Sequence, residues 1–347
     1  MRIAINCKDL QEPIGGAHQF ASNLTEFLTN SNHYVTRQLE TNIDLILIVV
    51  NHNNLKLNSF SLKDIYHFKK AYPSTLIIQR VNASDEQRGA KLGQNEYIEY
   101  ARKLSDHTIF VSEFMKNFWI KKNSSFRKDS SVILNGSNSK IFGTSKRGRE
   151  KKKIKIITHH WSQNFLKGFD IYQRFDEILE KPQIGNKVEF IYLGNIPAGF
   201  QFKNTTVIKP IKIIEVAKTL KKCDGYLTAS RLEPGGNHVT EALMSGLPVL
   251  YLNNGSHNEY CKGFGVRFSL STFDQNLKRF IKNIDILKRK TLKYNYNSEK
   301  MSKEYEQLFK SLLFKKNKVK SYPLVYTKYR IIENIKNFFL RILNYVK

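Results

Sequence analysis

Two glutamates and a pair of glycines form the part of the sequence best suited to chemistry, residues 230–251. Gly235 and Gly236 stand just before a predicted helix, where bare backbone N–H groups and the positive end of the helix dipole form an anion site. Glu233 precedes the glycines, and Glu241 follows early in the helix. A carboxylate beside an anion does not bind it, but accepts hydrogen bonds from attached hydroxyl groups, such as those of a ribose or a hexose. The stretch therefore predicts a site for a nucleotide-sugar.

The elements around this loop are those of a βαβ unit. An apolar run at 225–229 predicts a short strand before the loop, and 249–252 predicts the next buried strand. Between them we expect a helix over 237–245, with Asn237 as its N-cap and Gly246 as its stop.

The spacing E-P-x-G-x-x-x-x-E-A, followed by S-G-x-P-V, closely resembles the signature of retaining family 4 glycosyltransferases. These enzymes have two Rossmann-like domains that face a cleft, an arrangement called GT-B. The resemblance implies that Glu233 lies by the transferred sugar and that Glu241 binds the nucleotide ribose. It also implies that the backbone at Gly236 and Asn237 meets the diphosphate, and that transfer retains the anomeric configuration. The alternative is a glycine-rich loop with two solvated glutamates in another α/β protein.

A second strand, glycine pair and helix occur near the N-terminus. Residues 2–6 predict a strand, Gly15 and Gly16 lie in the loop after it, and 17–28 predicts an amphipathic helix. This segment is similar to the family's glycine loop, which closes on the donor diphosphate. Taken alone, the pair serves equally well as a tight turn.

The segment after the predicted strand 154–158 departs from the family pattern. At this position related enzymes have G-R-L and then K-G, and the arginine and lysine grip the leaving diphosphate. Lys167 matches the lysine, whereas His160 and Trp161 stand in the arginine region. A neutral imidazole carries no permanent charge, so half of the cationic clamp depends on protonation of His160 by the bound phosphate. The alternative for Lys167 is a solvated surface lysine.

No metal or other cofactor is expected. The sequence contains no D-x-D, and no third ligand stands at a metal spacing from His159 and His160. The charge on the leaving diphosphate would instead be stabilised by Lys167, the helix start near Gly236 and the Gly16 loop.

Acceptor contacts are expected in the N-terminal half. Polar residues that follow a strand lie at the edge where open α/β sheets bind ligands. The predicted strand 76–81 therefore makes Arg80, Asn82 and Asp85 candidate contacts to the acceptor, although Arg80 has the alternative of pairing with a neighbouring acid.

Strands and helices alternate through both halves, which predicts an α/β fold of two doubly wound Rossmann-like domains with C-terminal helices. We expect an acceptor-side domain over 1–145, a charged linker at 146–153, and a nucleotide-sugar-binding domain with closing helices over 154–314. A basic tail follows at 315–347. Within the closing segment, a helix is predicted over 273–290.

The tail combines a basic run with a predicted helix over 329–346 that has one apolar stripe. Cations beside this stripe, within 328–347, suit an anionic membrane surface, and a helix docked on the protein itself is the alternative. Three widely spaced cysteines and an N-terminus without a long apolar core favour a cytoplasmic protein, peripheral on the inner face of a membrane if the tail binds lipid. The acceptor would then be a glycan or a lipid-linked glycan.

A formal net charge of +27 indicates polyanionic partners without choosing among them. A nucleic-acid-binding protein is one alternative, but no reading module is recognisable and the aromatic residues are not interleaved with the basic runs, so no nucleic acid is expected. A nucleotide-sugar epimerase or a phosphorylase on the same fold is the nearer alternative.

Overall fold

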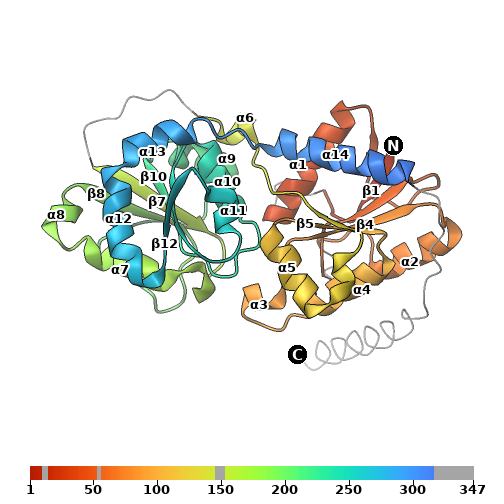
Figure 1. Ribbon diagram of the computed structural model, residues 1–347, viewed down its shortest axis with the longest axis horizontal. Helices are drawn as coiled ribbons and strands as arrows, with labels where there is room; N and C mark the ends of the chain where they lie inside the picture. Colours follow the sequence, from red (N-terminus) through yellow and green to blue (C-terminus); the bar gives the residue numbers. More distant parts are fainter. Residues whose placement is uncertain (10–14, 53–55, 145–152, 316–347) are drawn as a thin grey trace.

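Two parallel six-stranded sheets, one in each half of the chain, organise the computed structural model (Figure 1). The structure describes residues 1–9, 15–52, 56–144 and 153–315. Helices flank both sheets, so the predicted fold class of two facing Rossmann-like domains is confirmed.

The N-terminal sheet has the strand order β2-β1-β3-β4-β5-β6. Its strands are β1 (Arg2–Ile5), β2 (Tyr34–Thr36), β3 (Leu45–Ile48), β4 (Leu76–Val81), β5 (His107–Phe110) and β6 (Ser130–Val132). The helices of this half are α1 (Gly16–Asn30), α2 (Leu62–Ala71), α3 (Asp85–Arg88), α4 (Gln94–Leu104), α5 (Glu113–Lys122) and α6 (Ser139–Phe142).

The C-terminal sheet has the order β12-β11-β10-β7-β8-β9. Its strands are β7 (Ile154–His160), β8 (Val188–Gly194), β9 (Thr206–Ile208), β10 (Gly225–Thr228), β11 (Val249–Leu252) and β12 (Gly265–Phe268). The helices are α7 (Phe169–Ile178), α8 (Pro182–Gly185), α9 (Ile213–Leu220), α10 (Asn237–Met244), α11 (His257–Cys261), α12 (Phe273–Lys282), α13 (Ile284–Thr291) and α14 (Ser298–Phe314).

The strand order of the C-terminal sheet positions the site. Along the chain the sheet grows from β7 through β8 to β9, and then restarts on the other side of β7 with β10. Doubly wound sheets bind ligands at such a reversal, outside the carboxyl ends of the strands. Here β7 ends at His160 and β10 ends at Thr228, just before the loop that carries Glu233.

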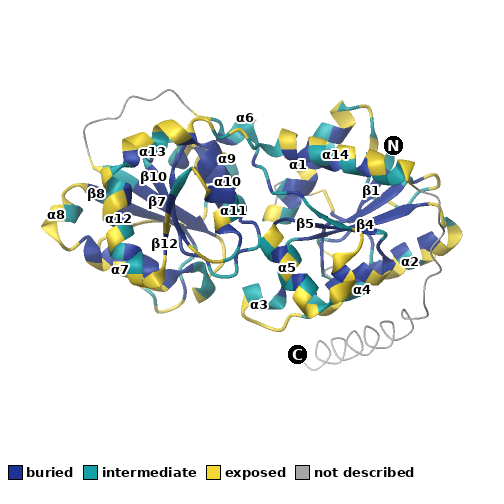
Figure 2. Ribbon diagram, viewed as in Figure 1, coloured by how far each residue is buried: buried dark blue, intermediate teal, exposed yellow. Residues whose placement is uncertain are grey.

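Continuous apolar runs build the centres of both sheets. Strand β3 reads LILI and all four of its residues are buried, as expected for a parallel strand covered on both faces. In Figure 2 the central strands are buried along their length, while exposed residues lie on the outer faces of the helices.

Several sequence-based expectations are corrected in detail. Helix α10 begins at Asn237, but its N-cap is Gly236, because the Asn237 side chain turns instead toward α1. The predicted helix 273–290 is two helices that meet at Asn283. The short edge strands β2 and β12 were not predicted, because the hydrophobic pattern of three or four residues is too short to identify a strand.

Helix α14 returns across the molecule and packs on the N-terminal domain, beside α1 (Figure 1). Its Tyr305 ring lies 5.0 Å from the ring of Phe20 in α1, and both are buried. The chain reaches this position by passing close to Gly136, where a Cβ atom would lie only 2.2 Å from the carbonyl oxygen of Asn297. The closing helix thus belongs to the core of the first domain.

A carboxylate of the C-terminal domain caps a helix of the N-terminal domain. The two oxygens of Glu259 in α11 accept hydrogen bonds from the backbone N–H groups of Glu113 and Phe114, at 2.6 and 2.8 Å. These donors open α5 and have no partner within their own helix. Nearby, the Tyr260 hydroxyl donates to the carbonyl oxygen of Val111 at 2.6 Å. These contacts fix the two domains relative to each other.

The predicted linker at 146–153 and the tail at 315–347 fall almost entirely outside the described residues. Among the helices that are described, none has both the length and the hydropathy needed to cross a membrane.

We predict that Glu259→Ala lowers the free energy of unfolding by about 1–2 kcal/mol, because two helix-terminal N–H groups lose their acceptor. Urea denaturation measures the loss. Glu180→Ala, which removes an exposed glutamate beyond the end of α7, is the matched control and should change stability by less than about 0.5 kcal/mol. Equal effects of the two substitutions would show that the interdomain cap carries no stability.

Candidate nucleotide-sugar site

A cavity of about 350 Å³ opens between the two domains, at the carboxyl ends of β7 and β10. Both halves of the chain contribute to its walls. The predicted site residues that line it are Gly16, Arg80, Asn82, His160, Lys167, Glu233, Gly235, Gly236, Asn237 and Glu241. The cavity thus brings together predicted site residues that lie more than two hundred positions apart in the sequence.

Asp85 is the exception: the structure places it outside this cavity, and its role as an acceptor contact stays a prediction. Its carboxylate accepts hydrogen bonds from the backbone N–H groups of Leu92 and Gln94, at 3.0 and 3.1 Å. These contacts hold the loop that leads into α4, and Asp85 does not line the cavity. The Asp85 carboxylate thus supplies acceptors for backbone N–H groups near the start of α4.

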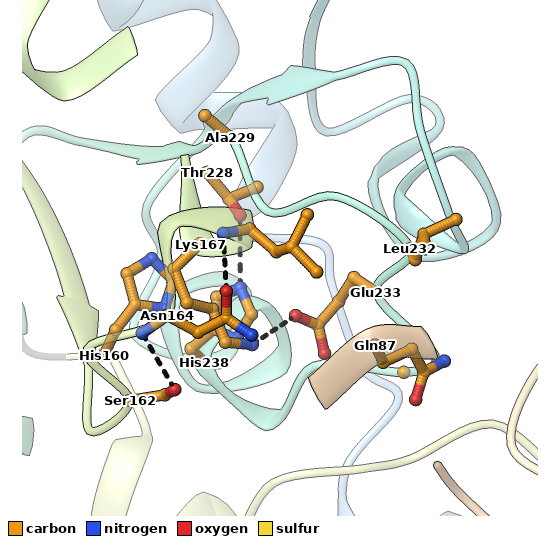
Figure 3. Close-up of polar contacts among 12 residues, drawn as sticks. Gln87, His160, Ser162, Asn164, Lys167, Thr228, Ala229, Leu232, Glu233 and His238 are labelled. Carbon is orange, nitrogen blue, oxygen red and sulfur yellow. Dashed lines mark hydrogen bonds and ion pairs between the residues drawn. The ribbon is translucent and has the colours of Figure 1, made fainter. Parts of the chain in front are cut away.

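Glu233 and Lys167 form an ion pair in the cavity wall, with 2.8 Å between Oε2 and Nζ (Figure 3). Glu233 is only 6% exposed. Burial raises the pKa of Glu233, but the Lys167 ammonium and the nearby His238 more than offset this effect, and the pKa is about 2. The structure therefore holds a buried negative charge at the position predicted to face the sugar.

The backbone around Glu233 is held from two sides. Leu232 has a left-handed conformation, with φ of 53°, and its N–H donates to Oδ1 of Asn254 at 2.6 Å. The carbonyl oxygen of Glu233 accepts from the N–H of Ser256 at 2.9 Å. Between these two contacts lies Gly255, where a Cβ atom would come within 2.5 Å of the Glu233 backbone nitrogen. Only glycine allows this close approach, which fixes the direction of the Glu233 side chain.

Glu241 is held by a histidine that the sequence did not single out as its partner. The Nε2 atom of His159 lies 2.8 Å from Oε2 of Glu241, and both side chains are buried. The other ring nitrogen, Nδ1, lies 3.2 Å from the Tyr226 hydroxyl. This three-residue chain fixes a carboxylate in the cavity wall one helical turn beyond the N-terminus of α10.

His160 is a neutral residue in this structure. Its Nε2 atom lies 2.7 Å from the Tyr172 hydroxyl, and the two rings stack. Burial lowers the pKa of His160 well below its usual value, and the electrostatic interactions with His238 and with the Lys167 ammonium lower it further. The protonated imidazole considered as the second half of the phosphate clamp is therefore disfavoured. Trp161, its neighbour, is partly exposed and carries no charge either.

Two further histidines, His238 and His257, lie close enough to Glu233 to interact with its carboxylate electrostatically. The His238 ring lies 4.9 Å from that of His160, and its Nε2 atom is 3.1 Å from the Thr228 hydroxyl (Figure 3). His257 is buried beside the same hydroxyl, at 3.4 Å. Within the described part of the chain, no three side chains of the metal-binding types form a group that could hold an ion.

The N-termini of two helices approach each other across the cavity. At Gly16, the first residue of α1, a Cβ atom would lie 2.9 Å from Nδ2 of Asn237, the first residue of α10. The same Nδ2 atom donates to Oε1 of Gln19 at 3.1 Å. Each helix start presents unpaired N–H groups and the positive end of a dipole, so this narrow region is suited to an anion.

No model of a known protein family matches the chain, and no curated protein is similar to it in sequence. Solved structures do match. Anabaena HepE in complex with UDP is 15% identical, with a TM-score of 0.64, over 90% of this chain and 100% of that one. Sucrose-phosphate synthase from Thermosynechococcus elongatus is 13% identical, with a TM-score of 0.63, over 89% of this chain and 98% of that one.

The catalytic domain of starch synthase IV from Arabidopsis thaliana, bound to ADP and acarbose, is 12% identical with a TM-score of 0.59. The match covers 90% of this chain and 99% of that domain. These neighbours are GT-B glycosyltransferases, so the fold implied by the sequence resemblance is confirmed.

We predict that Lys167→Met lowers the free energy of unfolding at pH 7 by about 1–3 kcal/mol, because it leaves Glu233 buried without a cation. The ordinary pKa of a glutamate, 4.5, applies to Glu233 in the unfolded chain, and its pKa in the folded protein is about 2. In the wild type this pair therefore stabilises the fold fully above pH 4.5, and the stabilisation is lost as the pH falls through about 2. The difference between the two proteins should therefore shrink in acid. Urea denaturation across this pH range measures it.

The double variant Lys167→Met/Glu233→Gln is the control. Because it removes the charge as well as its partner, it should recover part of the lost stability. If Lys167→Met is as stable as the wild type at pH 7, the ion pair contributes nothing and the low pKa of Glu233 has another origin.

Proposed function

We propose that the protein is a glycosyltransferase that uses a nucleotide-sugar donor. One observation carries the proposal: two helix N-termini and Lys167 converge on the same cavity as two buried carboxylates, Glu233 and Glu241. An anion site supplies the place for a diphosphate, and carboxylates supply acceptors for sugar hydroxyl groups. HepE, a structure of the same fold, binds UDP and UDP-glucose, which supports a donor of this class.

In the proposed reaction, the bond between the sugar and the diphosphate breaks and negative charge develops on the leaving diphosphate. The backbone N–H groups at the starts of α1 and α10, together with Lys167, stabilise that charge. Glu233 lies beside the transferred sugar, and Glu241 accepts hydrogen bonds from the ribose. No cofactor is required, because fixed cationic and dipolar groups perform the task that a metal ion performs elsewhere.

The finer assignments follow the resemblance to the family 4 enzymes. The anomeric configuration is retained, the transferred group is a hexose, and the acceptor is a glycan or a lipid-linked glycan bound near Asn82. No observation favours an epimerase, a phosphorylase or a nucleic-acid-binding protein over this assignment.

We predict different effects from the two carboxylates. Glu241→Gln should weaken donor binding about tenfold, because the ribose hydroxyls lose a charged acceptor. Glu233→Gln should instead lower kcat by on the order of a hundredfold with a smaller effect on the donor Kd, because its charge acts as the sugar bond breaks. A thermal-shift panel of nucleotide-sugars identifies the donor, and calorimetry and steady-state rates then compare the variants.

Glu180→Gln, an exposed substitution away from the cavity, is the control and should leave both quantities unchanged. Small and equal effects of the two cavity substitutions would contradict the assigned roles, and the absence of any stabilising nucleotide-sugar would contradict the function.

We also propose that the basic tail brings the enzyme to an anionic membrane surface, where a lipid-linked acceptor would lie. The proposal rests on the sequence pattern at 328–347, in which cations flank an apolar stripe. A chain that lacks residues 321–347 should stay folded and bind donor, but should no longer sediment with vesicles of phosphatidylserine and phosphatidylcholine.

Binding of the full chain to these vesicles should weaken steeply with added salt, since each cation near the surface contributes about 1 kcal/mol. Vesicles of phosphatidylcholine alone are the control. If truncation instead lowers the melting temperature by several degrees and leaves vesicle binding unchanged, the tail is part of the fold.

A further inference from the structure

Arg80 is a buried cation in the wall of the cavity. It stands in β4, is 1% exposed, and lines the space between the domains. Among the described residues it makes no ion pair, and two of its nitrogen atoms, Nε and Nη1, have no hydrogen-bond partner there. A buried charge without a partner is costly, so its position calls for an anion that enters from the cavity.

The described neighbours of Arg80 do not supply a negative charge. Its guanidinium carbon lies 3.9 Å from the centre of the Phe20 ring, and its Nη2 atom donates to Oδ1 of Asn135 at 2.8 Å. The guanidinium also lies within hydrogen-bonding reach of the Tyr305 hydroxyl, but burial raises the pKa of Tyr305 to about 12, so this group is neutral and supplies no negative charge. The guanidinium is oriented by these contacts without being neutralised by them.

A short chain of hydrogen bonds connects Arg80 to the start of α10. Asn135, which accepts from Arg80, donates through Nδ2 to the carbonyl oxygen of Gly235 at 2.6 Å. The same Nδ2 atom lies 3.2 Å from Oδ1 of Asn237. The guanidinium therefore stands two hydrogen bonds from the helix N-terminus that is suited to an anion, although it comes from the other domain.

The opposite wall of the cavity is short of positive charge. His160 is neutral, Trp161 is uncharged, and the Lys167 ammonium is already paired with Glu233. A nucleoside diphosphate carries more negative charge than this wall can balance, so a further cation is required for tight binding.

We propose that Arg80 is this second phosphate-binding cation, which donates from the N-terminal domain to the phosphoryl oxygens of the donor diphosphate. The inference rests on the proposed function and replaces the acceptor contact expected for Arg80 from sequence. It also makes donor binding depend on the contact between the domains, since Arg80 and α10 belong to different halves of the chain.

Calorimetry with inorganic pyrophosphate at constant ionic strength tests the proposal without requiring the nucleobase or the sugar to be known. Arg80→Gln should weaken pyrophosphate binding by about tenfold or more, the effect of losing a charge-assisted contact. Arg102→Gln is the matched control. It removes a buried arginine of the same domain whose hydrogen bonds go to backbone carbonyl oxygens, and should leave the affinity within about twofold.

Asn135→Ala separates a direct contact from a positioning role. It removes the acceptor of Arg80 and keeps the cation, so pyrophosphate binding should be weakened less than by Arg80→Gln. If Arg80→Gln binds pyrophosphate as the wild type does, or if Asn135→Ala is equally damaging, the proposal is overturned. Should Arg80→Gln fail to fold, Arg80→Lys decides, because the single ammonium cannot reproduce the planar contact and should weaken binding by about threefold or more.

These outcomes are distinct from failure of the proposed function. If no nucleotide-sugar stabilises the wild type but pyrophosphate binding still requires Arg80, the role of Arg80 in anion binding is supported and the glycosyltransferase assignment is refuted. If a nucleotide-sugar binds and Arg80→Gln has no effect on it, only the role of Arg80 is refuted.

Discussion

The candidate site depends on keeping a buried carboxylate negatively charged beside two helix N-termini, which are suited to an anion. Glu233 is almost fully buried, and the Lys167 ammonium at 2.8 Å holds its pKa near 2. Without that cation, burial would favour the protonated acid. Lys167 also lines the cavity, so in the proposed reaction its ammonium would interact both with the Glu233 carboxylate and with the charge that develops on the leaving diphosphate.

The fold places the buried carboxylate and the two helix N-termini around the same cavity. The C-terminal sheet changes direction between β7 and β10, and this opens the space into which Glu233 and the start of α10 project. The N-terminal domain closes the space with the start of α1 and with Arg80. Helix α14 and the cap formed by Glu259 hold the domains in this arrangement, so the two walls of the cavity belong to different cores.

Local spacing explains which parts of the site could be predicted from the sequence. Glu233, Gly236 and Glu241 lie within nine residues of one another, so a single loop and helix fix their geometry. The partners of these groups could not be predicted, because they depend on tertiary contacts. His159 meets Glu241 across 82 residues, and the pairing of β7 with β10 decides that contact. Asp85 lies outside the cavity, and its carboxylate accepts hydrogen bonds from backbone N–H groups close in sequence, near the start of α4.

A crystal structure of the protein with the nucleotide-sugar selected by binding would show directly where the donor lies. We expect the diphosphate between Gly16 and the N-terminus of α10, with the ribose hydroxyls on Glu241 and the sugar beside Glu233. A nucleotide bound elsewhere, or one bound in the cavity with its base where the diphosphate is expected, would rule out the assigned donor site.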